Sequence, residues 1–373
     1  MNSSKPPIFL NFHLSGEAQY EFMRRLNRQS EELSKRNGSF ELITVLQYGL
    51  GEIQEQEFSL EFPRLKFVWI PKNKLGYVYA LYKSLNYLSR EVDENQVIVA
   101  GDIWRAGLIV YLSSYGVSER KSQLSVHGYF NLGSGRSLGS RIKLLFIKKS
   151  VQRFTSIRFV SKHLIEYLNS LVPIEEGKTI ISHIPIRIPS LPRSEITARE
   201  PGILIVGRLH AERGVTEWMN ILDRILKLQK GLSIDIVGAG SLFDDVKNWK
   251  EVNNYESVRL HGFLQPYELE NLFYSKTLFL STAEHEGFGL AIHEAAARGM
   301  TIIAKSNAGV EEAKNLIGDS LISYDSIESA IRLINQQINT IIPNGNQLGL
   351  IERITKSNQE SLNNLLDSWS SSN

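Results

Sequence analysis

Two glutamates flank a glycine-containing turn in the stretch "AEHEGFGLAIHEAAARG", residues 283–299. Glu286 lies directly before the turn, and Glu294 lies eight positions later. Glycines let backbone N–H groups point at an anion or at sugar hydroxyls, and a helix that begins near residue 290 would add its positive end. On that helix Glu294 could accept both hydroxyls of a ribose, although a glutamate pair beside an ordinary turn has the same spacing. The amides available in the turn are those of Gly287, Phe288, Gly289 and Leu290.

A pair of arginines follows another strand-like run, in "GILIVGRLHAERGV". Arg208 and Arg213 would lie in the loop before the next helix, where guanidinium groups and a helix N-terminus together favour a bound phosphate. Two solvated loop charges give the same pattern, so both interpretations stay open. The glycines of "VGAGS", Gly238 and Gly240, are a weak signal, because tight packing of a strand against a helix explains them equally well.

The first half offers two further candidates. His127 follows a strand-like run in "LSVHGYF", a position where a lone histidine is more often structural than functional. Gly16 follows the first strand-like run and opens a predicted helix, so its amide could face a phosphate.

The residue types give no reason to expect a metal or a resident cofactor. The eight histidines are scattered without an H-x-x-x-H spacing, no D-x-D motif exists, and there is no cysteine. If a diphosphate is bound, arginines and helix N-termini must therefore neutralise its charge.

Strand-like and helical segments alternate along the whole chain, as expected of an α/β protein with parallel sheets. The pattern predicts two doubly wound, Rossmann-like domains with a cleft between them, and ligands at the carboxyl ends of the strands. The expected domains are residues 1–190 and 201–354, with a proline-containing boundary at 187–202 and a C-terminal helix at about 355–373 that could pack on the first domain. The strand-like runs are PIFLNFH, FELITVL, LKFVWI, QVIVAG, QLSVHG, SIRFVS, GILIVG, SIDIVG, VRLHGF, TLFLST, TIIAKS and SLISYD.

Composition narrows the class of protein further. The 373 residues are 42% hydrophobic and 22% charged with a net charge of +2, which argues against a disordered chain and against non-specific nucleic-acid binding. No secretion signal and no membrane-spanning apolar run are evident, so a cytoplasmic location is expected. Residues 120–165 contain ten Lys or Arg and no Asp or Glu. Within them, residues 136–158 fit either peripheral contact with an anionic membrane or an ordinary helix with a solvated face.

Taken together, these motifs resemble the retaining nucleotide-sugar glycosyltransferases of family 4, the glycosyl transferases group 1, which have the GT-B fold. The resemblance is most specific from residue 202 to residue 312, where "GRLHAERG" is similar to the family's G-R-L-x-x-x-K-G and the two glutamates match its E-x(7)-E. In the first half, "SVHG" and "RFVSKHLIEYL" match more loosely.

Four positions depart from the family pattern. Arg213 replaces a lysine, which keeps the charge and alters its reach, and Thr301 replaces a common proline. The segment "ISHIPIRIP" stands where an asparagine-glycine turn is frequent, and Ser15 precedes Gly16 where a glycine pair is usual.

The resemblance implies a role for each matching position. Arg208 and Arg213 would hold the diphosphate of the donor, Glu294 would bind the ribose, and Glu286 would contact the donor sugar. His127 would line the acceptor side and touch the transferred sugar. The remaining donor contacts would come from the backbone of Gly16, Gly287, Phe288, Gly289 and Leu290.

The implied activity is metal-independent transfer of a sugar, with retention, from a UDP-, GDP- or ADP-sugar to a saccharide or lipid-linked acceptor. Two alternatives stay open: a nucleotide-sugar epimerase or hydrolase on the same fold, and a non-catalytic sugar-nucleotide-binding scaffold subunit. The sequence identifies neither the base and sugar of the donor nor the acceptor.

Overall fold

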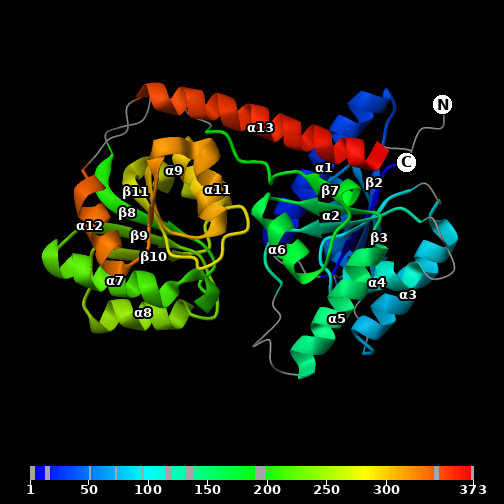
Figure 1. Ribbon diagram of the computed structural model, residues 1–373, viewed down its shortest axis with the longest axis horizontal. Helices are drawn as coiled ribbons and strands as arrows, with labels where there is room; N and C mark the ends of the chain where they lie inside the picture. Colours follow the sequence, from blue (N-terminus) through cyan, green and yellow to red (C-terminus); the bar gives the residue numbers. More distant parts are fainter. Residues whose placement is uncertain are drawn as a thin grey trace. The chain divides into compact units, whose positions relative to one another are not determined.

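The chain divides into two compact units, each built on its own parallel sheet (Figure 1). The computed structural model describes residues 5–12, 17–49, 52–71, 74–93, 96–114, 120–130, 138–189, 199–339 and 344–370. Unit 1 comprises Met1–His183 and Glu360–Asn373, and unit 2 comprises Ile184–Gln359. The units divide after His183 and after Gln359, whereas the sequence analysis placed the boundary at 187–202 and the end of the second domain at residue 354.

The sheet of unit 1 has seven parallel strands in the order β3-β2-β1-β4-β5-β6-β7. Six of them coincide with strand-like runs of the sequence. The seventh, β7, is a short strand that the sequence pattern did not predict. The strands are β1 (Ile8–Asn11), β2 (Ile43–Tyr48), β3 (Leu65–Ile70), β4 (Ile98–Ala100), β5 (Ser122–Val126), β6 (Ser156–Phe159) and β7 (Thr179–Ile181).

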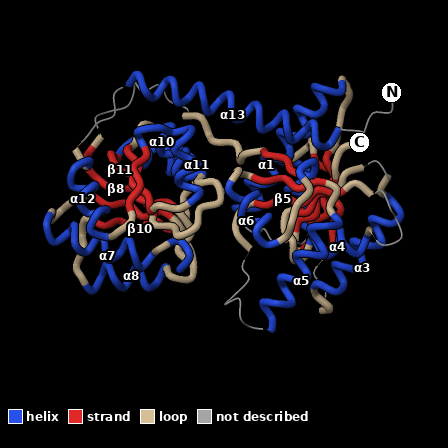
Figure 2. Tube along the Cα trace, viewed as in Figure 1, coloured by secondary structure: helices blue, strands red, loops and turns tan. Residues whose placement is uncertain are grey.

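Helices cover this sheet on both faces, as Figure 2 shows. In a parallel sheet the chain must return from the end of one strand to the start of the next, and the connecting helices pack on the faces of the sheet. Helices α3, α4 and α5 are packed side by side, and Phe146 of α5 contacts Trp104 and Tyr111 beside and within α4. The helices are α1 (Glu17–Asn37), α2 (Glu52–Glu61), α3 (Tyr77–Glu91), α4 (Ala106–Ser113), α5 (Leu138–Arg153) and α6 (His163–Leu171).

The C-terminal helix α13 (Asn344–Ser370) contributes its last turns to the core of unit 1. It begins earlier in the chain than the sequence suggested. Leu365, Leu366 and Trp369 are buried, and the Trp369 ring meets the Phe9 ring edge-on at 5.6 Å. The Trp369 Nε1 also donates to Gln123 Oε1 at 3.3 Å, so its polar end is satisfied inside the core.

We predict that Trp369→Ala lowers the free energy of unfolding of unit 1 by about 3–5 kcal/mol, because it leaves a large cavity and removes the partner of Gln123. Urea unfolding followed by circular dichroism measures this change. Leu348→Ala on the same helix is the matched control, since Leu348 is 68% exposed. Equal unfolding midpoints for the two variants would contradict the assigned packing.

The sheet of unit 2 has six parallel strands in the order β10-β9-β8-β11-β12-β13. All six coincide with predicted runs. The direction of winding reverses between β8 and β11, and in such sheets ligands bind outside the carboxyl ends of the strands at that point. The strands are β8 (Glu200–Val206), β9 (Ser233–Val237), β10 (Val258–Gly262), β11 (Lys276–Ser281), β12 (Thr301–Lys305) and β13 (Leu321–Tyr324).

In Figure 1, α7 and α8 lie on one side of this sheet, and α9 and α11 lie on the other. Within α7, Trp218, Ile221, Leu222 and Ile225 are buried as their spacing predicts, but Leu228 is exposed, because the helix ends there. The helices are α7 (Val215–Leu228), α8 (Phe243–Val252), α9 (Pro266–Ser275), α10 (Leu290–Ala297), α11 (Ala308–Ile317) and α12 (Ile327–Gln337). Among the described residues, no helix is both long enough and apolar enough to cross a bilayer.

Candidate functional site

The candidate site of unit 2 is assembled from loops that follow parallel strands. The loop after β8 carries Arg208 and Arg213, and the loop after β11 carries Glu286. Because β8 and β11 are hydrogen-bonded neighbours, their carboxyl ends open at the same edge of the sheet. The sequence placed these side chains on separate loops, and the topology makes those loops adjacent.

An ion pair joins the two loops. Arg213 Nη1 donates to Glu286 Oε2 at 2.9 Å. The Arg213 side chain is 32% exposed and the Glu286 side chain 12%, so the pair is partly shielded from solvent. The Thr282 hydroxyl donates to the backbone oxygens of Arg213 and Gly214 at 3.0 and 2.9 Å, which fixes the loop that carries the guanidinium.

Backbone packing leaves no room for a side chain at two glycines, one that follows the loop of Arg213 and one on the helix beside the loop of Glu286. Gly214 has a φ of 67°, and a Cβ there would lie 2.1 Å from the carbonyl oxygen of Thr282. A Cβ at Gly309, in α11, would lie 2.2 Å from the carbonyl oxygen of Glu286. The loop of Glu286 therefore rests directly on the first turn of α11.

The residue before α11 holds the same loop by hydrogen bonds. Asn307 Nδ2 donates to the Ala283 carbonyl at 3.0 Å, and Asn307 Oδ1 accepts from Val310 N at 3.1 Å as a helix N-cap. Sequence reasoning missed this residue. The signal was an asparagine shortly after a strand-like run and immediately before a helical pattern.

The turn before α10 has the conformation that its glycine suggests. Gly289 adopts a φ of 77° as the residue preceding the helix, and Leu290 begins the helix as predicted. The ring of Phe288 stacks on His293 at 4.6 Å, and His293 Nδ1 lies 2.9 Å from the Gly289 carbonyl. Since a carbonyl only accepts, Nδ1 carries the proton. The stack and this hydrogen bond fix the turn against the helix.

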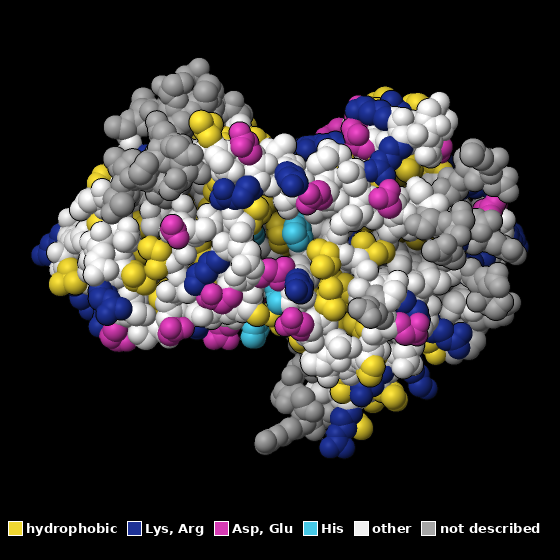
Figure 3. Space-filling view, turned by 45° about the horizontal axis from the view of Figure 1, so that its top comes forward, with side chains coloured by type: hydrophobic (Ala, Val, Ile, Leu, Met, Phe, Trp, Pro, Cys, Tyr) yellow, Lys and Arg dark blue, Asp and Glu magenta, His cyan; other side chains and the backbone are white. Residues whose placement is uncertain are grey.

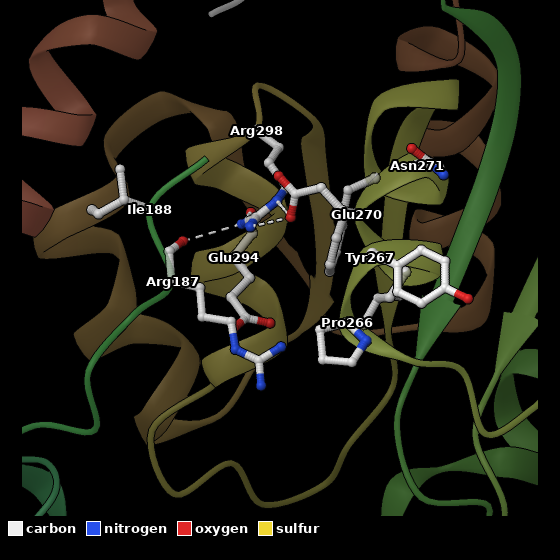
Figure 4. A pocket seen from close by; sticks show the side chains of 10 residues that line it. Arg187, Ile188, Pro266, Tyr267, Glu270, Asn271, Glu294 and Arg298 are labelled. Atoms are coloured by element: carbon white, nitrogen blue, oxygen red, sulfur yellow. Dashed lines mark hydrogen bonds and ion pairs between the residues drawn. The ribbon is translucent and has the colours of Figure 1, made fainter. Parts of the chain in front are cut away.

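Glu294 lies on α10 and lines a pocket of about 460 Å³ within unit 2 (Figure 4). Its side chain is 9% exposed, and Arg187 Nε lies 3.8 Å from Glu294 Oε1. In Figure 4 this carboxylate and the Arg187 guanidinium lie side by side, with Pro266 and Tyr267 of α9 across the opening. The cavity therefore combines a carboxylate, which can accept hydrogen bonds from hydroxyl groups, with the proline and tyrosine rings, which can pack against a planar group.

Arg298 stabilises the wall of this pocket. It is 2% exposed, donates from Nε to Glu270 Oε2 at 2.8 Å, and donates from Nη1 to the carbonyls of Arg187 and Glu294 at 3.2 and 3.0 Å. A buried guanidinium with these partners links α9, α10 and residue 187. The sequence pattern marked residue 187 only as the start of a domain boundary, and neither Arg187 nor Arg298 was predicted to belong to a site.

Arg208 is the exposed member of the arginine pair. Its side chain is 64% exposed and lies 3.6 Å from Glu212, a surface ion pair that contributes little to stability. The structure thus brings Arg213 and Glu286 into contact and leaves Arg208 on the outer side of the same loop.

The Gly238 and Gly240 motif serves backbone packing. A Cβ at Gly238 would lie 1.8 Å from the Gly207 carbonyl oxygen, and one at Gly240 would lie 2.4 Å from the Leu209 carbonyl oxygen. The loop after β9 therefore packs against the loop after β8, which agrees with the packing interpretation of this motif.

The two candidates of the first half belong to unit 1. His127 directly follows β5 and its side chain is exposed. Desolvation lowers the pKa of His127, as do the guanidiniums of Arg158 and Arg25. Because the side chain is exposed, the two positive charges are the better supported cause, and both causes favour a neutral imidazole. Gly16 lies outside the described residues.

The described ranges contain no cluster of side chains suited to bind a metal ion. There, no group of three or more His, Cys, Asp or Glu side chains is arranged to hold an ion.

The second unit is similar in sequence to known glycosyltransferases. Residues 190–340 match the family model "Glycosyl transferases group 1". Glycogen synthase of Mycobacterium tuberculosis is 30% identical over 115 residues, which cover 30% of this chain and 27% of that protein. One subunit of the phosphatidylinositol N-acetylglucosaminyltransferase of Homo sapiens is 28% identical over 120 residues, which cover 31% of this chain and 24% of that protein. The matches therefore span about a quarter of each curated relative.

Solved structures resemble the chain over nearly its whole length. TarM of S. aureus, in complex with UDP, has a TM-score of 0.69 at 11% identity and covers 98% of this chain and 100% of its own. HepE of Anabaena, in complex with UDP and glucose, has a TM-score of 0.68 at 16% identity and covers 97% and 99%. WaaG, a glycosyltransferase of lipopolysaccharide biosynthesis, has a TM-score of 0.67 at 12% identity and covers 97% and 99%. The chain has the GT-B fold, and residues 190–340 are similar to the glycosyl transferases group 1 family.

We predict that Gly309→Ala lowers the free energy of unfolding by about 1–3 kcal/mol, because the new methyl group must displace the loop of Glu286. Gly177→Ala is the matched control, since a Cβ at Gly177 meets nothing within 4 Å. Equilibrium unfolding in urea compares the two. A Gly309→Ala variant as stable as its control would show that the loop does not rest on α11 as described.

Proposed function

We propose that the protein is a retaining glycosyltransferase that moves a sugar from a nucleotide diphosphate donor to a saccharide or lipid-linked acceptor without a metal ion. The observation that carries the proposal is the arrangement of the Arg213–Glu286 pair and the Glu294 pocket on the loops and helix that follow β8 and β11. Each part of such a donor has a chemically suitable partner in this arrangement. The Arg213 guanidinium suits the diphosphate, the turn at the N-terminus of α10 suits phosphate and sugar oxygens, and the buried carboxylate of the pocket suits the ribose hydroxyls.

Charge balance supports donor binding through Arg213. Arg213 Nη1 donates to the Glu286 carboxylate at 2.9 Å. A diphosphate brings negative charge and planar oxygen pairs that suit a guanidinium fork, so it competes with the carboxylate for the same donors. Glu286 released in this way becomes an acceptor for hydroxyls of the donor sugar. Arg208, which is exposed on the same loop, adds a second positive charge.

The nucleoside of the donor is proposed to bind in the pocket of Figure 4. Glu294 is proposed to accept the two ribose hydroxyls, and Pro266 and Tyr267 to face the base. The amides of Gly287, Phe288, Gly289 and Leu290 are proposed to meet phosphate and sugar oxygens, because the N-terminus of α10 attracts negative charge.

Transfer with retention needs stabilisation of the leaving diphosphate more than a strong protein base. In the proposed step, the bond from the anomeric carbon to the phosphate oxygen breaks, and the acceptor oxygen forms a bond on the same face. The acceptor's proton passes to the departing phosphate, and Arg213 stabilises the charge that develops there. His127 of unit 1, held neutral, is proposed to contact the transferred sugar, and Gly16 to contact the phosphate.

We further propose that the donor is a UDP-, GDP- or ADP-sugar, that the protein is cytoplasmic with peripheral contact at a membrane, and that it uses no cofactor.

Two alternative functions predict different behaviour. An epimerase or hydrolase would use the same donor site without an acceptor, and a scaffold subunit would bind the donor without turnover.

The proposal is tested by incubating the purified chain with UDP-, GDP- and ADP-sugars and with saccharide or lipid-linked acceptors, in the presence of a chelator. Acceptor-dependent release of nucleoside diphosphate, with a product of unchanged anomeric configuration by NMR, is expected. Release that needs no acceptor would favour the hydrolase. Binding without any release would favour the scaffold.

We predict that Glu294→Gln raises the transition-state free energy for donor use by about 1.5–3 kcal/mol, because a charge-assisted hydrogen bond to ribose is lost. The change is measured as kcat/KM for the donor. Glu328→Gln, a substitution of an exposed glutamate paired with Arg224, is the matched control. An unchanged kcat/KM in a folded Glu294→Gln variant would remove Glu294 from the ribose site.

We predict opposite effects on nucleoside diphosphate affinity for the two members of the ion pair. Arg213→Gln should weaken binding by roughly tenfold or more, because a charged donor is lost. Glu286→Gln should leave binding equal or tighter, because the competing carboxylate is neutral, while it lowers turnover. Calorimetric titration with the diphosphate and with the corresponding nucleoside measures both effects. Loss of affinity for the nucleoside alone would indicate a different place for the phosphates.

A further inference from the structure

Exposed apolar side chains are concentrated on α3 and α5, two helices of unit 1 that both pack against α4. Fourteen large hydrophobic residues are exposed in the part of the chain that the structure describes, and six of them lie on α5 or on α3 and the residue shortly before it. They are Leu75, Val78, Tyr82, Leu138, Ile142 and Leu145, with exposed fractions from 56% to 74%. A concentration of exposed apolar side chains on two helices of one unit needs an explanation other than chance exposure.

On α5 these residues form one stripe. Leu138, Ile142 and Leu145 are separated by four and three positions, so they lie on the same side of the helix. The helix has a different face for its own core, where Ile147 and Val151 are buried. An ordinary surface helix has one apolar face directed at the core, so this second apolar stripe is not accounted for by the fold of unit 1.

The stripe is surrounded by positive charge. Helix α5 carries Arg141, Lys143, Lys148, Lys149 and Arg153 and contains no acidic residue. All five of these side chains are exposed, and Figure 3 shows hydrophobic and basic side chains intermixed in the lower part of the view.

Helix α3 also carries exposed apolar side chains and an exposed lysine. Val78 and Tyr82 are spaced four apart on α3, and Leu75 shortly precedes them. The exposed Lys83 lies over the Tyr79 ring of the same helix at 5.6 Å. The two helices are linked through α4, against which both pack. We name the six apolar residues with the basic residues of α5 and Lys83 the α3–α5 surface.

We propose that the α3–α5 surface docks the protein on an anionic lipid bilayer. Apolar side chains of moderate size can enter the boundary between headgroups and acyl chains, while lysine and arginine contact the negative headgroups. A second copy of the chain would bring like charges together, and a polyanion such as nucleic acid would leave the leucine and isoleucine side chains exposed. An anionic bilayer offers partners for both the apolar and the basic side chains of the α3–α5 surface.

The surface differs from the sequence expectation in its extent. The sequence indicated one basic helix over residues 136–158, but α5 ends at Arg153, Phe154 is buried, and β6 begins at Ser156. Residues 136 and 137 lie outside the described residues. The membrane contact is therefore assigned to residues 138–149 of α5, with α3 as an added element that sequence periodicity did not reveal.

This inference stands without the sugar transfer proposed above, because docking can be measured with no donor present. If both hold, they favour a lipid-linked acceptor over a soluble saccharide, since the enzyme is then concentrated where such acceptors lie.

The test is sedimentation of the full chain with vesicles of phosphatidylcholine alone, or of equal parts phosphatidylcholine and phosphatidylglycerol. Binding is expected only to the mixed vesicles and should fall as salt rises, because added ions screen the attraction. Lys148→Gln and Lys149→Gln should each weaken binding about fivefold. Ile142→Ser and Leu145→Ser should each weaken it about tenfold, at unchanged salt dependence. Val78→Ser should weaken it in the same direction.

The matched control is Lys227→Gln with Leu228→Ser on unit 2, where a leucine that is 70% exposed follows a lysine outside any such cluster. Circular dichroism establishes that each variant is folded. The proposal is overturned if the mixed vesicles fail to bind the chain at low salt, if neutral vesicles bind it equally, or if the α5 variants bind like the control. Retention on heparin without vesicle binding would also overturn it, in favour of another polyanion.

Discussion

The close approach of loop backbones at the carboxyl edge of the second sheet is the constraint on which the candidate site depends. Gly214 lies against Thr282, and Gly309 lies against the backbone of Glu286, at separations that exclude any side chain. These contacts hold the loops after β8, β11 and β12 together, so Arg213 and Glu286 meet although 73 positions separate them. Hydrogen bonds from Thr282 and Asn307 then leave the charged side chains little freedom in position.

The charged side chains of the site are paired with one another. Arg213 pairs with Glu286, and Arg187 lies beside Glu294. Each cation therefore avoids the cost of partial burial without a counter-charge. A ligand that brings both phosphate and hydroxyl groups can exchange with these internal partners one for one. Under the proposed function, a whole nucleotide-sugar would replace both pairs, whereas a free sugar or a simple anion would replace only one.

Much of the fold could be predicted from the sequence, because parallel strands and amphipathic helices have distinct periods. The twelve predicted strands are present, and α7 buries Trp218 where its spacing requires. Strand β7 was missed because its three residues are only partly buried, which leaves no clear apolar pattern. Arg187 was missed for a different reason. Its contact with Glu294 is set by tertiary packing, and nothing in the local sequence of a boundary segment indicates it.

A thermal-shift measurement on the intact chain with UDP, GDP, ADP and their common sugars, in the presence of a chelator, tests the proposed donor site most directly. A ligand that binds only the folded state raises Tm by mass action. We expect a clear rise with the diphosphate and sugar of one base, and a smaller rise with the corresponding monophosphate, because Arg213 is proposed to bind the diphosphate. No rise with any of these ligands, or a rise that requires a divalent metal, would contradict a metal-independent nucleotide-sugar site on this unit.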